Sequence, residues 1–266
     1  MSKAILFRAV MACACLLVFA AVAHGQSASD ELRAGVQAYK SARYDDAIEH
    51  FQKAIQLDPN FAKARLYLAT AYMEQYIPGA ESPENVAMAE RALAEYNFLL
   101  QHDQSAEEQR TALRGLAALN FQMKRFDKAS EYYKQIVERD PKDAEAHYSL
   151  GVIEWMQAYQ PTQELRNELH LKPTEAIPAG TACARLRASN QDKVAEGISD
   201  LEKALEIRPD YDDAMAYMNL LYRLKAEYEC DDPAAREADV KTADDWVDRT
   251  METKKKKAER GGATPP

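Results

Sequence analysis

The stretch Tyr44–Asn60, YDDAIEHFQKAIQLDPN, decides the fold, because its pattern returns twice further along the chain. The related stretches are Phe126–Lys142 (FDKASEYYKQIVERDPK) and Gly197–Asp210 (GISDLEKALEIRPD). Ala47, Phe51 and Ala54 recur at helical spacing and share one face, where small residues let a neighbouring helix approach. A proline near the end of each stretch ends the helix, because the residue before a proline is pushed out of the α region. The sequence therefore contains three copies of one helical unit.

The composition favours an all-α protein. Of 266 residues, 47% are hydrophobic, which is enough to build a core, and 29% are charged. Only nine are glycine, so few tight turns and few strands are expected. The rest is rich in Ala, Leu, Glu, Lys and Gln, all good helix formers.

The helix pairs resemble the tetratricopeptide repeat, a helix–turn–helix unit. Gly35 takes the small-residue position of a first helix, Ala47, Phe51 and Ala54 take the pattern of a second helix, and Pro59 is the repeat's proline. The resemblance implies a right-handed α-solenoid of about five units over 27–258. The expected units are about 28–61, 62–106, 110–143, 144–211 and 212–257. The alternative for such periodicity is a plain helical bundle.

Units two, four and five depart from the repeat by insertions between their two helices. The longest insertion, 157–193, is about one repeat long and contains LHLKP, which resembles the IQLDP ending. Pro178 and Gly180 would lie inside a further first helix and are poorly tolerated there. We therefore predict one or two short helices in the insertion, TQELRNEL and TACARLRAS, and leave a degenerate sixth repeat as the alternative.

The two cysteines outside the N-terminal segment, Cys183 and Cys230, fall in the insertions of units four and five. The repeat resemblance implies that the turns between first and second helices project from one edge, so neighbouring insertions emerge side by side. We therefore expect a Cys183–Cys230 disulfide in an exported protein. The alternative is two unpaired thiols.

Residues 1–25 have the pattern of a secretory signal peptide. Lys3 and Arg8 precede an apolar run over 9–23, and small residues follow it. The run is shorter than the ~20 residues of a membrane-spanning helix. We predict an exported, most simply periplasmic, bacterial protein. The alternatives are an extracellular protein, an uncleaved inner-membrane anchor, and lipid attachment at Cys13 or Cys15.

The formal net charge of −9 argues against a nucleic-acid partner. The basic run Lys254–Lys257 is the local exception and suits the negative end of a helix dipole. The other interpretation is that this run contacts anionic lipid or an acidic partner. We expect a disordered tail over 259–266.

Motifs for catalysis or metal binding do not appear in the sequence. The histidines His50, His102, His147 and His170 fall in separate units and have no metal-ligand spacing partner. A nucleophile elbow and a phosphate-binding glycine loop are also missing. We therefore predict no catalytic residue, no cofactor and no metal, so that the chain is not an enzyme, with an unrecognised enzyme as the remote alternative.

The resemblance implies that first helices line a concave groove. The expected partner-binding residues are Tyr39, Leu66, Met73, Arg114, Phe121, Tyr148, Trp155 and Arg223. An apolar and aromatic groove suits a peptide or protein segment. We predict a scaffold for protein interactions in the bacterial envelope, and a structural subunit of an envelope or secretion assembly is the alternative. Each aromatic residue could instead be packing between repeats, and the oligomeric state stays open.

Overall fold

The computed structural model describes residues 27–102, 105–172 and 175–261, and this part of the chain folds into helices joined by short turns. The helices are α2 (Ala28–Lys40), α3 (Tyr44–Leu57), α4 (Ala62–Gln75), α5 (Pro83–His102), α6 (Ala106–Gln122), α7 (Phe126–Arg139), α8 (Ala144–Glu168), α9 (Thr181–Ile207), α10 (Asp212–Tyr228) and α11 (Pro233–Gly261). The expected signal peptide, 1–25, lies outside the described residues.

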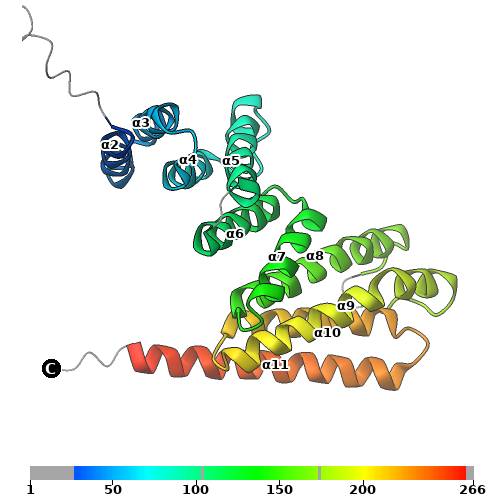
Figure 1. Ribbon diagram of the computed structural model, residues 1–266. Helices are drawn as coiled ribbons and strands as arrows, with labels where there is room; N and C mark the ends of the chain where they lie inside the picture. The colour runs from blue at the N-terminus through cyan, green and yellow to red at the C-terminus, as the bar shows by residue number, and fades with distance from the viewer. Residues whose placement is uncertain (1–26, 103–104, 173–174, 262–266) are drawn as a thin grey trace, which may run out of the picture.

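Consecutive helices pair into five antiparallel units, and the units stack in chain order from α2–α3 to α10–α11 (Figure 1). The all-α solenoid with five helix–turn–helix units is thus confirmed. Two boundaries differ from the prediction. Unit three begins at Ala106 rather than at 110. Glu259, Arg260 and Gly261 are helical, so disorder from Glu259 is wrong for them, and the remainder of the expected tail lies outside the described residues.

The repeated proline endings have one backbone geometry. Asp58, Asp140 and Arg208 each precede a proline and each leave the α region in the same way, with φ of −138°, −136° and −130° and ψ of 95°, 85° and 88°. Each also donates its backbone N–H to the carbonyl four residues earlier. The steric clash with the proline ring forces this conformation, and it ends the second helix in units one, three and four.

Three first helices end alike. Ala42, Lys124 and His170 lie in the left-handed region, with φ of 56°, 57° and 52°. The next residue then donates its N–H five residues back, over 2.8–3.0 Å, which closes the helix end. The shared ending shows that α8 is a lengthened first helix of unit four.

The predicted short helices of the 157–193 insertion are therefore wrong. TQELRNEL belongs to the end of α8, and TACARLRAS to the start of α9. The insertion lengthens both helices of unit four and does not form a sixth repeat. Pro161 lies inside α8, and Asn190 of α9 braces this region by donating to the Ala158 carbonyl (2.8 Å) and to Thr162 Oγ1 (2.9 Å).

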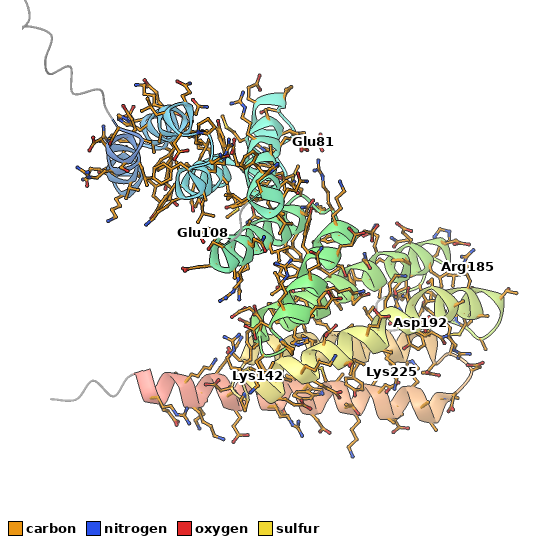
Figure 2. All side chains as sticks on the ribbon, in the orientation of Figure 1. Glu81, Glu108, Lys142, Arg185, Asp192 and Lys225 are labelled. Atoms are coloured by element: carbon orange, nitrogen blue, oxygen red, sulfur yellow. A yellow bond between two sulfur atoms is a disulfide. The ribbon has the colours of Figure 1, made fainter. Side chains whose placement is uncertain are left out.

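The extension is tied to unit five. The structure joins Cys183 to Cys230 in a disulfide, with Cα atoms 6.2 Å apart. The buried Arg166 donates to both carboxylate oxygens of Glu227, at 3.0 and 2.8 Å. Arg187 donates to the Tyr228 carbonyl at 2.8 Å. Figure 2 labels Arg185 in the same part of α9 and Lys225 on α10, on one side of the molecule.

Buried apolar side chains form three clusters. The first core cluster spans units one to three, between Ala38 and Leu119. The second core cluster spans units four and five, between Ala158 and Tyr228. A small bridging cluster of Leu113, Ala117, Ile136 and Ala146 joins α6, α7 and α8.

Candidate functional site

An aromatic cluster lies on the first helices of units four and five. We define it as Tyr148, Trp155 and Tyr159 of α8 with Tyr211 and Tyr217 at α10. Trp155 stacks on Tyr159 with centroids 5.0 Å apart and meets Tyr217 edge-on at 5.4 Å. Tyr148 lies 4.8 Å from Tyr211 and 5.7 Å from Tyr217. The cluster is thus one continuous set of ring contacts.

Helical spacing builds the cluster. Tyr148, Trp155 and Tyr159 are seven and four residues apart, so they share one face of α8. Trp155 and Tyr148 are partly buried against the second core cluster, and Tyr159 is 41% exposed. Burial raises the pKa of both Tyr148 and Tyr217, so their hydroxyls stay protonated at neutral pH. The cluster therefore presents uncharged rings with hydroxyls able to donate.

The predicted groove residues of units one to three lie in packing positions. Tyr39, Leu66 and Met73 are partly buried against the first core cluster. The Tyr39 hydroxyl donates to Glu74 Oε1 of α4 at 3.3 Å, and burial, with Glu74 beside it, raises the pKa of Tyr39 to about 12. Phe121 meets Phe126 of its own unit at 5.9 Å.

The two predicted arginines are both paired. Arg114 of α6 donates to the buried Asp143, which caps α8 by accepting from the Ala146 N–H at 3.1 Å. Arg223 of α10 donates to Asp244 of α11 at 2.7 Å. Arg223 therefore holds the last two helices together, whereas Arg114 joins unit three to the start of unit four.

Of the predicted groove residues, Tyr148 and Trp155 are thus the two that belong to the aromatic cluster. The sequence analysis missed Tyr159 and Tyr217, which join them. Tyr159 could have been found as the residue four after Trp155, because that spacing places both on one face of the helix that begins at Ala144. Tyr217 lies on α10, as does the predicted Arg223, and no sequence signal marked the direction of its side chain.

The described residues carry no sign of a metal site or a membrane span. No three His, Cys, Asp or Glu side chains gather as metal ligands among them. Within the same ranges no helix combines the length and apolar character needed to cross a bilayer. In the basic run at the C-terminal end of α11, Lys256 pairs with Glu252 and Lys257 with Asp212, so half of the run already holds intramolecular partners.

Comparison with known proteins places the repeats in a family. A family model described as "TPR repeat" matches residues 37–75, and one described as "Tetratricopeptide repeat" matches residues 110–153. No curated protein sequence matches the chain.

Several solved structures are similar over nearly the whole chain. The crystal structure of MamA protein covers 91% of this chain and 100% of its own, with a TM-score of 0.59 and 18% identity. MamA from Desulfovibrio magneticus RS-1 covers 88% of this chain and 98% of its own, with a TM-score of 0.57 and 15% identity. YrrB, described as a TPR protein with an unusual peptide-binding site, covers 88% and 94%, with a TM-score of 0.55 and 14% identity. At these identities the likeness shows the fold.

The repeated proline endings, the five stacked helix pairs and the two matching models lead to one conclusion. The chain is a tetratricopeptide-repeat protein, built on a fold that generally serves as a scaffold for protein interactions.

Proposed function

We propose that this protein binds a peptide segment of a partner protein on the aromatic cluster of units four and five. The observation that carries the proposal is the partly buried Trp155, stacked on the exposed Tyr159 and held edge-on by Tyr217. Aromatic rings give large contact area at low cost in side-chain entropy, and they dominate binding energy in many interfaces. The peptide-binding site of YrrB, on a similar fold, supports the proposal.

The rigidity of the cluster also favours binding. Each ring already contacts a neighbour, and the second core cluster holds Tyr148, Trp155 and Tyr217 from behind. A preorganised surface loses little conformational entropy when a ligand arrives. The partner we expect is therefore a segment with an apolar or aromatic side chain that packs against Trp155 and Tyr159.

A random-peptide selection on the purified protein tests this proposal. The chain has two tryptophans, so Trp246→Phe leaves Trp155 as the sole source of tryptophan fluorescence. Selected peptides should quench or shift its emission on titration. Trp155→Ala with Tyr159→Ala should weaken binding about tenfold or more, as expected for hot-spot residues. Met251→Ala, which removes a side chain of α11 that is 65% exposed, is the matched control and should leave binding unchanged.

Helical circular dichroism must show that each variant is folded. If the selected peptides bind the Trp155/Tyr159 variant as well as the wild type, the aromatic cluster is packing between repeats and the proposal is wrong.

We also propose that the protein is exported and works in the bacterial envelope. The charged start and apolar run of residues 1–25 support this proposal, as does the Cys183–Cys230 pair, because disulfides persist in oxidising compartments. Cell fractionation with sequencing of the mature N-terminus tests it. A full-length chain recovered from the cytosol would contradict it.

A further inference from the structure

A cavity of 440 Å³ lies between the start of α6 and the end of α7. Its apolar floor is Leu113 and Ile136, which belong to the bridging cluster. Three arginine side chains line it: Arg110, Arg114 and Arg139. An apolar floor below several guanidinium groups suits a ligand that carries an anionic group on an apolar body.

The acids around this cavity already hold other partners. Asp140, which lines it, accepts from the Lys142 N–H at 3.2 Å, and Asp143 accepts from Arg114. Glu145, in the first turn of α8, accepts from Arg208 Nη2 and from the Tyr211 hydroxyl, each at 2.6 Å. These contacts leave Arg110 and Arg139 without an acidic partner in the described part of the chain.

Unpaired arginines facing one cavity are notable in this chain. It contains 43 acids against 34 bases, and most of its described arginines pair with a carboxylate or lie over an aromatic ring. Both guanidinium groups are exposed to solvent, and Asp140 is the carboxylate that lines the cavity with them. An oxyanion bound there would accept several charge-assisted hydrogen bonds at once.

Two contacts at the start of α8 link the cavity to the aromatic cluster. Arg114 holds Asp143, the N-cap of α8, and Glu145 binds the Tyr211 hydroxyl of the cluster. Along α8 the rise from Asp143 is ~8 Å to Tyr148 and ~18 Å to Trp155, at 1.5 Å per residue. An extended peptide covers that span in about two to six residues, at ~3.3 Å each.

We infer that the Arg110–Arg114–Arg139 cavity binds a carboxylate of the same partner segment whose apolar side chain packs on the aromatic cluster. The inference rests on the proposed function and adds a recognition rule to it. The partner carries an acidic residue about two to six positions from an aromatic or large aliphatic residue. The carboxylate belongs to an aspartate or glutamate side chain, or to the chain end.

The peptides selected on the purified protein test this rule. Their sequences should be enriched in Asp or Glu at that spacing from an apolar residue. Resynthesised peptides should lose about tenfold or more in affinity when the acid is changed to its amide, the loss expected for a charge-assisted hydrogen bond. Arg110→Gln with Arg139→Gln should cause a similar loss, and the two losses should not add when combined. Arg114 is left in place because it supports the α8 cap.

Matched controls separate this result from general electrostatics and from misfolding. Arg236→Gln removes an α11 arginine that likewise has no acidic partner in the described chain, and it should leave affinity unchanged. Circular dichroism checks the fold of each variant. Peptides with an amidated C-terminus distinguish the source of the carboxylate: loss on amidation assigns the chain end, and retained affinity assigns the side chain.

Three outcomes are decisive. Acid-dependent binding that is lost in the Arg110/Arg139 variant supports the inference. Peptides that need Trp155 but bind without an acid, or bind the Arg110/Arg139 variant unchanged, overturn it and leave the proposed function standing. Peptides that bind independently of Trp155 and Tyr159 overturn the proposed function, and the spacing rule with it.

Discussion

Glu154 is a carboxylic acid buried where α8 crosses α9, at a position flanked by Gly197. Burial, together with the negative charge of the nearby Glu196, raises the pKa of its carboxyl to about 7. The folded protein therefore prefers the neutral form. The unfolded chain releases this proton near the ordinary glutamate pKa, so stability is lost as pH rises from about 4.5 to about 7.

Glu154→Gln should therefore stabilise the protein in alkaline solution. At pH 8 we expect a gain of about 1–3 kcal/mol in the free energy of unfolding, because the ionised carboxylate is replaced by a neutral isostere. At pH 4 Glu154 is protonated in both the folded and the unfolded wild type, so the two proteins should have nearly the same free energy of unfolding. Chemical denaturation of both proteins across this range measures it, and a gain that does not depend on pH would refute the assignment to Glu154.

Gly151 of α8 marks the closest approach of the helices in unit four. A Cβ atom there would lie 2.5 Å from the Leu201 side chain and 3.1 Å from the Gly197 carbonyl oxygen. At an open helical site, glycine to alanine stabilises by about 1 kcal/mol. Here we expect Gly151→Ala to destabilise by about 1–3 kcal/mol, because the core is overpacked. Gln160→Ala, an exposed change on the same helix, is the control in thermal melts.

At the scale of elements, local chemistry determined what could be predicted from sequence. The three proline endings depend on a clash between adjacent residues, so the helix ends at Asp58, Asp140 and Arg208 could be predicted from the sequence. The lengthening of α8 and α9 was not predicted, because Pro161 looks like a helix break although it lies inside α8. Asn190 of α9 braces the turn around Pro161 by donating to the Ala158 carbonyl and to Thr162 Oγ1, a tertiary contact that no local pattern reveals.

The candidate site follows the same division. Tyr148 and Trp155 were found because helical spacing identifies a shared face on α8. Tyr217 joins them from another helix, so its place depends on how units four and five stack. The cavity arginines Arg110 and Arg139 were missed for the same reason, because they come from two helices and meet only in the fold.

The unit-four extension should depend on its disulfide. Changing both Cys183 and Cys230 to alanine should lower stability by about 2–4 kcal/mol, because the link closes a loop with a sequence separation of 47. Thermal melting of the variant, and of wild type with a reductant, should show the same lowered midpoint. Mass spectrometry of the oxidised protein should find the peptides of Cys183 and Cys230 linked, and free thiols at these two positions would contradict the pairing.

At the scale of the whole molecule, two large core clusters meet through a small one. Repeat proteins gain cooperativity from the interfaces between neighbouring units, so the weakest interface decides whether the array unfolds as one body. Here that interface is the bridging cluster, where Ile136 of α7 packs with Leu113 and Ala146. Its four residues are few beside the clusters that they join.

Ile136→Ala should therefore uncouple the two halves. Trp155 and Trp246 both pack against the second core cluster, so fluorescence reports that half alone, while far-UV circular dichroism reports every helix. We expect the two denaturation curves to coincide in the wild type and to separate in the variant, after a loss of about 2–5 kcal/mol at the bridge. Leu99→Ala, equally buried but inside the first core cluster, is the control. If Ile136→Ala shifts both curves together, coupling between the halves does not depend on this cluster.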